Sequence, residues 1–376
     1  MNSITPIRLD VYRTRLPMRS FEHAAASRSV AEAIVTRLQT AEGREGWGET
    51  LPRPYVTGET LETVLRDIRH YIWAAVAGES LTEAHLAERI PARCSEDRCI
   101  NAACCAVELA CHDALLREEN APPSLPIAAR VTGVLGSRSP RKTARRLMAM
   151  RLFGLRDFKL KLGLGEDADA ANLRLVHRRL GRKLRKGRCT LRVDVNGGWT
   201  PEETPARARE LTGQGVSAIE QPFFGSADQL AEVADRCPVR LIADESLLTE
   251  DDARALLAGS TPVMWNLRIS KNGGLAQTLR LAKLAAEHDV PFVVGAMVGE
   301  SGILSAAQRR LLQRTPTVRF VEGNYGRFLL GDDLTRPSPR FGFGGRLRPL
   351  KSPGLGVQVD TDRLARYGEH VATLTV

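Results

Sequence analysis

Three acidic residues stand at nearly equal intervals along the chain, and each closes a strand-like run of apolar residues. Asp194 ends the run 191–194, Glu220 ends the run 216–220 and Asp244 ends the run 240–244. The intervals from 194 to 220 and from 220 to 244 are 26 and 24 residues, about one strand–loop–helix unit each. Because equal spacing puts each acid at the same place in its own unit, a barrel of parallel strands would gather all three on one rim.

The three acids predict a metal site. Carboxylates held close together repel one another strongly unless a divalent cation lies between them. Ligands that are all oxygen atoms favour a hard ion, so Mg²⁺ is the expected ion and Mn²⁺ the second choice.

Two lysines on the strand-like run 157–161 provide a candidate base. Lys159 and Lys161 are two residues apart, so their side chains share one face of a strand. Two inward ammonium groups disfavour each other's protonation, and one of them could be neutral at pH 7 and act as a base. The alternative is that one or both face solvent at a sheet edge. A lysine base beside a carboxylate-bound Mg²⁺ indicates removal of the proton next to a substrate carboxylate, which gives an enediolate that the metal stabilises.

The pattern before residue 122 predicts an α+β domain, because strands come first and helices follow. Strands are expected at 7–12, 33–38 and 45–49, irregular segments at 18–27 and 52–59, and helices from 61 to about 117. The segment 120–124 is rich in turn-forming residues and marks the boundary of this domain.

Eight apolar runs alternate with helical stretches after that boundary, which favours an α/β fold of the TIM-barrel type. The runs are 127–131, 157–161, the three that end in acids, 263–268, 291–295 and 318–322. A last strand at 354–360 is expected to rejoin the first domain. The predicted domains are therefore 1–122 together with about 346–376, and a barrel at 123–345 that carries the metal site.

The composition of the chain limits its expected cellular location and the classes of partner that it can bind. The 376 residues contain no apolar run of about 18 residues, and the first residues lack the form of a signal peptide, so we expect a cytoplasmic protein with no membrane partner. The net charge of +10 is densest at 178–188, where no aromatic residue interleaves. We expect a solvated helix end there and no nucleic-acid partner, with attraction of anionic substrates as the alternative. Five of the seven cysteines lie between 94 and 111 and are expected to be buried thiols, with redox or metal chemistry as the alternative.

At this point the chain resembles the enolase superfamily, in its muconate lactonizing (mandelate racemase/muconate lactonizing enzyme-like) subgroup. The matching segments are 46–49 (Gly-Trp-Gly-Glu), Lys159-x-Lys161, Asp194-x-Asn196 with 197–199, 219–222 (Ile-Glu-Gln-Pro), 243–246 (Ala-Asp-Glu-Ser), 271–274 (Lys-Asn-Gly-Gly) and 353–357. The resemblance implies a modified (β/α)7β TIM barrel with an N-terminal α+β capping domain. It implies Asp194, Glu220 and Asp244 as metal ligands, Lys161 as the base, Lys159 as its electrostatic support, and Glu245 beside the ligands, where it could orient a lysine. It also implies a homo-oligomer.

One position departs from the subgroup and bears on the reaction. The subgroup usually has a lysine on the sixth strand where this chain has Arg268. Arginine keeps its proton and is a poor base, although it can pair with a carboxylate. Epimerisation needs a proton taken from one face and returned on the other, so we expect a one-base reaction, either cycloisomerisation or a syn elimination such as dehydration. The alternatives are that Lys271 takes the missing role, or that Arg268 only neutralises buried acids.

Other reactions and contacts stay open from the sequence. A racemase or epimerase of an amino-acid derivative or dipeptide is the alternative reaction, and a barrel that binds Mg²⁺ and an acid without turnover is the alternative of another class. Glu300 and Glu322 end strands and could reach the substrate, as could Asn196, whereas Glu322 could also pair with a barrel arginine. Phe21, His23 and Tyr55 in the first domain are candidates for covering a small carboxylate substrate, and Arg19 and Arg53 for holding a second carboxylate.

Overall fold

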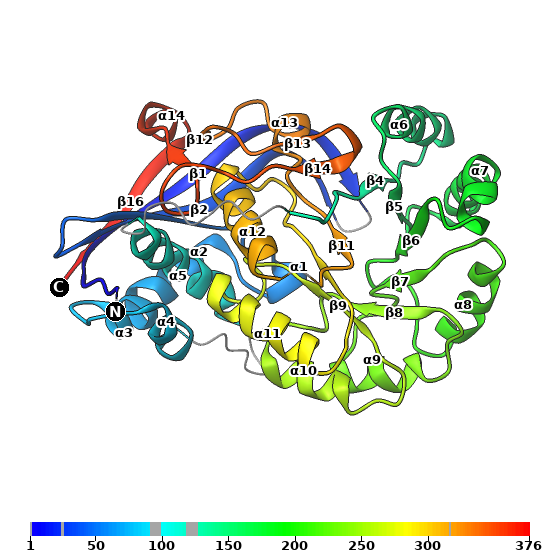
Figure 1. Ribbon diagram of the computed structural model, residues 1–376, viewed down its shortest axis with the longest axis horizontal. Coiled ribbons are helices and arrows are strands. Elements are labelled where there is room, and N and C mark those ends of the chain that lie inside the picture. Colours follow the sequence, from blue (N-terminus) through cyan, green and yellow to red (C-terminus); the bar gives the residue numbers. More distant parts are fainter. Residues whose placement is uncertain (1, 24–25, 91–98, 118–126, 316) are drawn as a thin grey trace.

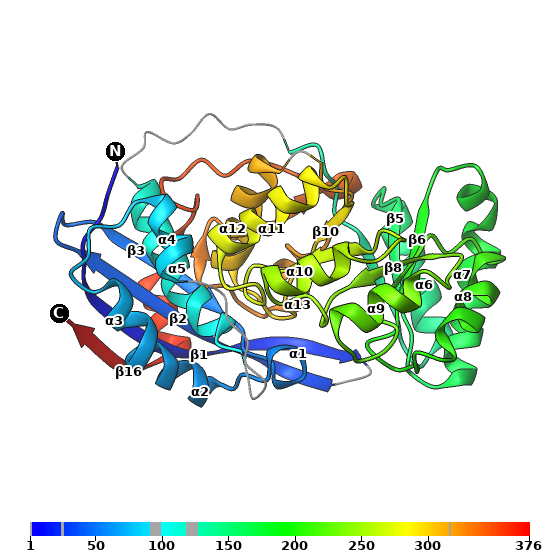
Figure 2. The same cartoon turned by 90° about the horizontal axis from the view of Figure 1, so that it is seen from below.

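The structure, a computed structural model, describes residues 2–23, 26–90, 99–117, 127–315 and 317–376, and of residues 20–23 and 26–28 it describes the backbone alone. Figure 1 shows a four-stranded sheet with helices beside it and, next to it, a curled parallel sheet that carries helices on its outside. Both chain ends lie on the side of the four-stranded sheet, away from helices α7 and α8 (Figure 2).

The first domain combines an antiparallel sheet with a group of helices, as predicted. Its sheet has the order β16-β1-β2-β3, and the last strand of the chain therefore closes this sheet beside β1. The strands are β1 Pro6–His23, β2 Ala26–Thr40, β3 Glu45–Thr50 and β16 Gly368–Thr375. The helices are α1 Pro54–Thr57, α2 Leu61–Asp67, the π-helix η1 Ile68–Ile72, α3 Trp73–Val76, α4 Glu83–Arg89 and α5 Asn101–Leu116.

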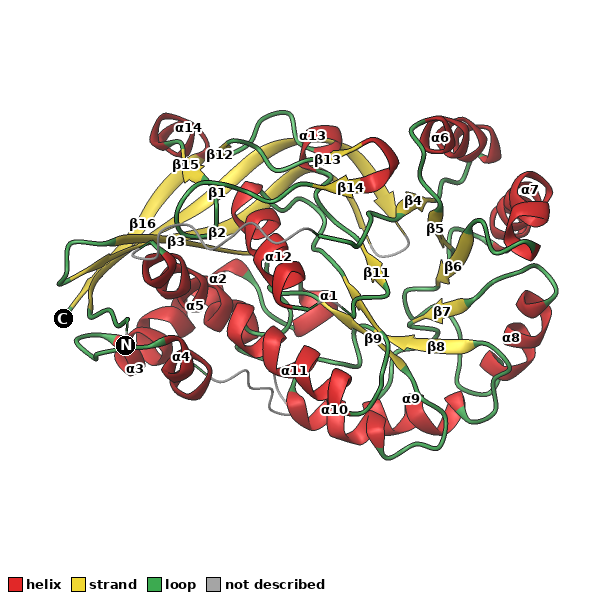
Figure 3. Ribbon diagram, viewed as in Figure 1, coloured by secondary structure: helices red, strands yellow, loops and turns green. Residues whose placement is uncertain are grey.

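The second domain alternates strands and helices and forms one parallel sheet in the order β11-β10-β9-β8-β7-β6-β5-β4 (Figure 3). Val131 forms a parallel bridge with Val321, which joins the two ends of this curled sheet. The strands are β4 Gly133–Leu135, β5 Asp157–Lys161, β6 Thr190–Asp194, β7 Ala218–Glu220, β8 Arg240–Ala243, β9 Met264–Leu267, β10 Phe292–Val294 and β11 Phe320–Val321. The helices between them are α6 Pro140–Leu152, α7 Glu166–Arg185, α8 Thr204–Thr212, α9 Ala227–Ala234, α10 Glu250–Leu257, α11 Leu275–Glu287 and α12 Gly302–Arg314. Seven strand–helix units and an eighth strand make the predicted (β/α)7β barrel.

The remaining elements after β11 are short. They are α13 Gly326–Leu329, β12 Thr335–Arg336, β13 Phe341–Gly342, the 3-10 helix η2 Phe343–Gly345, β14 Arg346–Leu347, β15 Gln358–Val359 and α14 Thr361–Tyr367. The predicted boundary between the barrel and the returning C-terminal segment, at about residue 345, lies between β12 and β15. Because these two strands pair with each other, the boundary stays a prediction.

Four predictions about the path of the chain were wrong. The first barrel strand is β4 at 133–135, because the preceding Val131 and Thr132 are held by backbone bonds to Gly345 and Val321 instead of by β5. The strand that rejoins the first domain is β16, whereas the predicted strand at 354–360 contains β15, which pairs with β12. Residues 18–23 and 26–27 of the predicted irregular segment belong to β1 and β2, which stay paired after a register shift between Pro17 and Phe21. The segment 52–59 contains the one-turn helix α1.

The cysteine prediction is right for Cys104, Cys105 and Cys111, which are buried free thiols on α5. It was wrong for Cys99, which is disulfide-bonded, and Cys94 lies outside the described residues. The basic run begins inside α7, whose last turn carries Arg182, Lys183 and Arg185, where cations favour the negative end of the helix dipole.

Helix α5 explains the glycines of the Gly-Trp-Gly-Glu segment. Residues 101–115 of α5 are all buried, and the helix packs directly on β3. A Cβ atom at Gly46 would lie 2.0 Å from the carbonyl oxygen of Ala110, and one at Gly48 would lie 2.0 Å from that of Ala106. Only glycine allows this close approach of strand and helix.

Carboxylates of the first domain bind the exposed N–H groups at the starts of two barrel helices. Glu49 accepts hydrogen bonds from the backbone N–H groups of Ser301 (2.9 Å) and Leu304 (3.0 Å) and from the Ser301 hydroxyl (2.7 Å), at the start of α12. Glu108 accepts from the N–H groups of Leu275 (2.7 Å) and Ala276 (3.0 Å), at the start of α11. These bonds satisfy helix donors that have no partner inside the helix, so they hold the two domains in one orientation.

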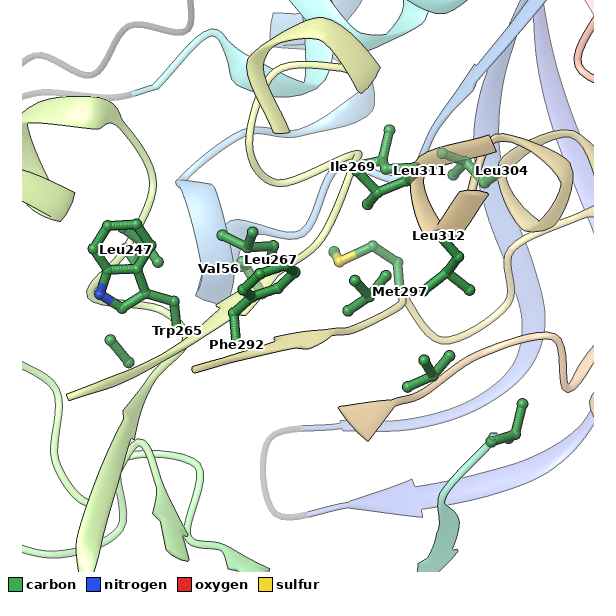
Figure 4. Packing of buried hydrophobic residues seen from close by; sticks show 14 of the residues in the cluster. Val56, Leu247, Trp265, Leu267, Ile269, Phe292, Met297, Leu304, Leu311 and Leu312 are labelled. Atoms are coloured by element: carbon green, nitrogen blue, oxygen red, sulfur yellow. The ribbon is translucent and has the colours of Figure 1, made fainter. Parts of the chain in front are cut away.

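Apolar packing continues across the same interface. One buried cluster contains residues of both domains, and Figure 4 shows Val56 of α1 together with Leu267 of β9, Trp265 of β9 and Phe292 of β10. Among the described residues, the helices include none that is long and apolar enough to cross a bilayer.

Glu49 gives the fold a pH dependence that can be measured. Burial raises the pKa of Glu49 to about 7 from 4.5, although its three donors act in the opposite direction. The folded state then binds a proton more tightly than the unfolded state, so this contribution to stability is complete below about pH 4.5 and is lost as the pH rises through about 7. Between pH 5 and 8, the free energy of unfolding of wild type should fall by about 2 kcal/mol relative to Glu49→Gln, as measured by urea unfolding. Glu369→Gln on the exposed face of β16 is the control, and an equal pH profile for wild type and Glu49→Gln would contradict the assignment.

Candidate active site

The carboxyl ends of β5 to β9 bring the charged residues of the sequence motifs together. In the register of the sheet, Lys161 lies beside Asp194, and Asp194 lies beside Glu220. Asp244 directly follows β8, and Arg268 directly follows β9. Because β5 and β9 are four positions apart in the eight-strand order, lysines and arginine approach from opposite sides of the barrel.

Lys159 lies at the centre of the carboxylates. Its Nζ is 2.9 Å from Glu220 Oε1, 3.3 Å from Asp194 Oδ2 and 2.5 Å from Glu322 Oε2. Burial acts to lower the pKa of the Lys159 ammonium, but Glu220, Glu322 and Asp194 outweigh it and raise that pKa above its usual value. Lys159 therefore keeps its proton and supplies positive charge.

Lys161 is the more accessible of the two lysines. Its side chain is 13% exposed, against 3% for Lys159, and it lines the cavity described below. Its Nζ is 3.2 Å from Asp194 Oδ2 and donates a hydrogen bond to Asn196 Oδ1 at 3.1 Å. Burial acts to raise the pKa of Asp194, but Lys161, Lys159 and Arg268 hold it well below its usual range.

Arg268 faces the site from β9 and pairs with acids. Its guanidinium forms a close ion pair with Asp244, lies 3.9 Å from Glu220 and contacts Met297 Sδ at 3.8 Å. Its side chain is 12% exposed and lines the cavity. Arg268 thus occupies the position opposite Lys161, and it also neutralises Asp244.

Lys271 does not reach the cavity, so it does not take the place of the missing lysine. Its buried Nζ donates to the carbonyl oxygens of Asp244 (2.5 Å) and Asn266 (2.8 Å) and to Asp244 Oδ1 (3.1 Å). Burial and Arg268 lower the pKa of Lys271. Burial and Asp194 raise the pKa of Glu245, which lines the cavity, to about 7.

Arg192 is a residue of the site that the sequence analysis missed. It is fully buried on β6, 2.9 Å from Glu322 and 3.8 Å from Glu220, and it donates to Thr132 Oγ1 at 3.1 Å. The period of two that placed Lys159 beside Lys161 also places Arg192 on the face of Asp194, and this signal could have identified it. Glu322 therefore pairs with a barrel arginine as well as with Lys159.

Each of the three predicted metal ligands has one carboxylate oxygen that is available to bind a cation. Asp194 Oδ2, Glu220 Oε2 and Asp244 Oδ2 are buried and accept no hydrogen bond from the described residues, although cations stand near them. Oxygen atoms of this kind fit a hard divalent ion. Within the described ranges, however, no three His, Cys, Asp or Glu side chains are close enough together to hold a metal ion. Lys159, Lys161 and Arg268 instead lie against the carboxylates. The ligand roles therefore stay predictions.

A cavity of about 590 Å³ opens above these residues. Its charged and polar lining comes from Arg19, Tyr55, Arg146, Lys159, Lys161, Asn196, Glu245, Arg268, Glu300, Ser305, Glu322, Asn324 and Tyr325. Tyr55 thus lies where a cover for the substrate was expected, whereas the side chains of Phe21 and His23 lie outside the described residues. Arg53 is buried and donates to the carbonyl oxygens of Glu32, Pro52 and Val298, so it holds loops.

The cavity has an apolar part that no sequence motif indicated. Met150 of α6 and Phe153, which directly follows α6, line it together with Phe328 and Phe341. Phe341 contacts Phe153 at 5.9 Å and Phe328 at 5.5 Å between ring centroids. Glu300 also lines the cavity, and burial raises its pKa to about 8.

Comparison with known proteins identifies the two parts of the chain. Residues 141–363 match the family model Enolase C-terminal domain-like, and residues 6–124 match Mandelate racemase / muconate lactonizing enzyme, N-terminal domain. These matches cover most of the chain and agree with the resemblance found from the motifs.

Three relatives illustrate the range of reactions in the family. The chain is 27% identical over 370 residues to N-succinyl-L-Arg/Lys racemase of Bacillus cereus, with 96% of each chain covered. It is 31% identical over 353 residues to L-Lys-D/L-Arg epimerase of Methylococcus capsulatus, with 88% of this chain and 93% of the relative covered. The solved structure of muconate lactonizing enzyme from Pseudomonas fluorescens, complexed with muconolactone, has a TM-score of 0.82 at 25% identity and covers 98% of this chain and 100% of its own.

Proposed function

We propose that this chain, which belongs to the mandelate racemase/muconate lactonizing enzyme family of the enolase superfamily, removes the proton next to the carboxylate of a small substrate. The observation that carries the proposal is the placement of Lys161 at the cavity, between buried carboxylates on one side and Arg268 on the other. Homo-oligomer formation is part of the same proposal and rests on the family alone.

Lys161 is the proposed base. It lines the cavity, so a substrate can reach its Nζ, whereas Lys159 is held by three carboxylates. Protonated Lys159 beside Lys161 provides positive charge for the carbanion that proton removal creates. Asn196 accepts a hydrogen bond from Lys161 and so orients its amine.

Asp194, Glu220 and Asp244 are the proposed ligands of Mg²⁺, or of Mn²⁺. Their hydrogen-bond-free oxygens and full burial support this assignment. A bound divalent ion would supply positive charge next to the substrate carboxylate. Lys159, Lys161 and Arg268 would then give up part of their contact with the three acids.

Inversion at the α-carbon is the reaction that the relatives favour, so racemisation or epimerisation of an amino-acid derivative or dipeptide is the first candidate. The relatives thus support this alternative better than the cycloisomerase or dehydratase that was expected from Arg268 in the sequence. The racemase and the epimerase both align with most of this chain.

A one-base reaction is the second candidate, and Arg268 is the observation that favours it. A guanidinium that keeps its proton cannot remove a proton from the second face of the substrate. Cycloisomerisation or a syn elimination needs only Lys161.

Metal binding can be tested without a substrate. Mg²⁺ at about 5 mM should raise the melting temperature of wild type, since it binds the folded state alone. Asp194→Asn and Glu220→Gln should each remove most of that shift, because each loses a charged ligand. Glu203→Gln, a partly exposed acid at the start of α8, should keep it. An equal shift in all four proteins would contradict the ligand assignment.

Proton removal can be tested in D₂O by proton NMR with N-succinyl-L-arginine, an L-Lys-L-Arg dipeptide and cis,cis-muconate. Wild type should incorporate deuterium at the α-carbon of one of the two amino-acid compounds, and Lys161→Ala should lower that rate at least about 1000-fold while the shift in melting temperature with Mg²⁺ remains. Exchange with inversion supports the epimerase, and exchange with retention or lactone formation supports the one-base candidate. Full activity of Lys161→Ala, or tight binding without exchange or turnover of any of these acids, would refute the proposed chemistry.

Arg268→Lys tests the position opposite the base. A lysine there can lose its proton, so exchange with inversion should become at least about tenfold faster relative to exchange with retention. Arg19→Lys, at another cavity arginine, should leave the ratio unchanged. If Arg268→Lys leaves the ratio at its wild-type value, Arg268 does not face the α-carbon.

A further inference from the structure

A second cavity, of about 670 Å³, lies at the opposite end of the barrel strands from the proposed active site. We call it the basic cavity, and its lining is Arg130, Arg151, Gly154, Leu155, Arg156, Lys183, Arg188, Cys189, Phe343, Gly344 and Arg346. Arg156 directly precedes β5 and Cys189 directly precedes β6, so the cavity opens at the amino ends of these strands. Leu155 lines both cavities, which therefore share one wall.

Among the residues that the structure describes, six cations line the basic cavity and no carboxylate does. Over the ranges that the structure describes, none of the six has an acidic partner within 4 Å, whereas Arg207 of α8 and Arg254 of α10 pair with Glu203 and Glu250. Arg151 is half-buried, and its Nε is buried and forms no hydrogen bond with any described residue. Six cations that form no ion pair with a described residue repel one another, although Asp157 is near Cys189, and an anion with several charges would relieve that repulsion.

Helix dipoles explain only part of this charge. Arg151 and Lys183 lie in the last turns of α6 and α7, where a cation is favourable in any case. Arg130, Arg156 and Arg188 lie outside helices, in the segments that lead into β4, β5 and β6, and Arg346 begins β14. The chain therefore gathers cations from separate segments at a place where the fold itself has no need of them.

One aromatic side chain at the basic cavity has no role in the core. Phe343 is 66% exposed, and its ring touches Phe153 at 5.9 Å between centroids. An exposed ring beside arginines is the combination that proteins use to stack a base while cations bind its phosphates. The volume is in the range of small-ligand sites and limits the occupant to about one nucleotide.

We propose that the basic cavity binds a nucleoside polyphosphate, with the phosphates among Arg151, Arg156 and Arg188 and the base against Phe343. Each guanidinium group can donate two parallel hydrogen bonds to phosphate oxygens. The negative charge of two or three linked phosphates balances six cations better than the charge of a single phosphate does. The site is independent of the reaction proposed at the other end of the barrel.

The test is calorimetric titration of the full chain with ATP, pyrophosphate and adenosine at about 150 mM salt, where weak surface attraction is screened. ATP should bind one to one, pyrophosphate about tenfold more weakly, and adenosine at about 1 mM not at all. The double variant Arg156→Glu/Arg188→Glu should weaken ATP binding roughly 100-fold, because two charge-assisted contacts become repulsive.

Two comparisons separate a site from general attraction. Arg145→Glu/Arg178→Glu makes the same change in net charge at exposed positions outside the cavity and should change ATP affinity less than about threefold. Phe343→Ala should weaken ATP about tenfold and leave pyrophosphate unchanged, and this exposed position keeps the test valid if the double variant does not fold. The proposal is wrong if wild type does not bind ATP, if both charge-reversed pairs weaken ATP equally, if Phe343→Ala has no effect on ATP, or if a single-stranded oligonucleotide displaces ATP at equal nucleotide concentration.

Discussion

The barrel depends on a balance of charges that are buried together. Five carboxylates, from Asp194, Glu220, Asp244, Glu245 and Glu322, share the carboxyl end of the sheet with five cations, from Lys159, Lys161, Arg192, Arg268 and Lys271. Any one of these groups would be very costly to bury alone, and removing one partner of such a pair costs about 3–5 kcal/mol. The set is therefore stable as a whole, and under the proposed function a substrate would enter a site whose electric field is already in place.

The first domain takes part in this arrangement through the loops that follow the strands. Glu49 binds the start of α12, and its neighbour Thr50 lies 2.9 Å from the Ser270 hydroxyl, which also accepts a hydrogen bond from the N–H of Leu51 at 3.0 Å. Ser270 is two residues after Arg268, so the edge of the first domain fixes the loop that carries the arginine. The same segment leads to Tyr55, which lines the cavity. The first domain thus positions the loop that carries Arg268, the residue opposite the proposed base, and adds Tyr55 to the cavity wall.

The sequence predicted the barrel and the gathering of its charged residues because both follow from period and spacing. Lys161, Asp194, Glu220 and Asp244 each end or directly follow a buried strand, Lys159 lies two residues before Lys161 on the same face of β5, and the sheet register aligns Lys161 with Asp194 and Asp194 with Glu220 without help from distant contacts. The hairpin through residue 23 and the pairing of β15 with β12 could not be predicted, since long-range pairing and not local pattern decides them. Arg192 was missed because a charged residue within an apolar strand gives no sign of its role until its partners are known. Those partners, Glu220 and Glu322, lie at the ends of other strands. The apolar part of the cavity comes from α6 and the segment near Phe341, which only the fold brings together.

Arg268 sets a thermodynamic condition on any inversion that this chain catalyses. If Lys161 removed the proton and Arg268 returned one, Arg268 would be left as a neutral guanidinium, a form that arginine side chains do not populate near pH 7. Starting from the opposite stereoisomer, the reverse path must begin from that same rare form. The equilibrium constant of a racemisation is one, so the penalty slows both directions equally and cannot be avoided by favouring one of them. An epimerase with this site must therefore return the proton through another donor, such as water in the cavity, whereas a one-base reaction meets no such condition.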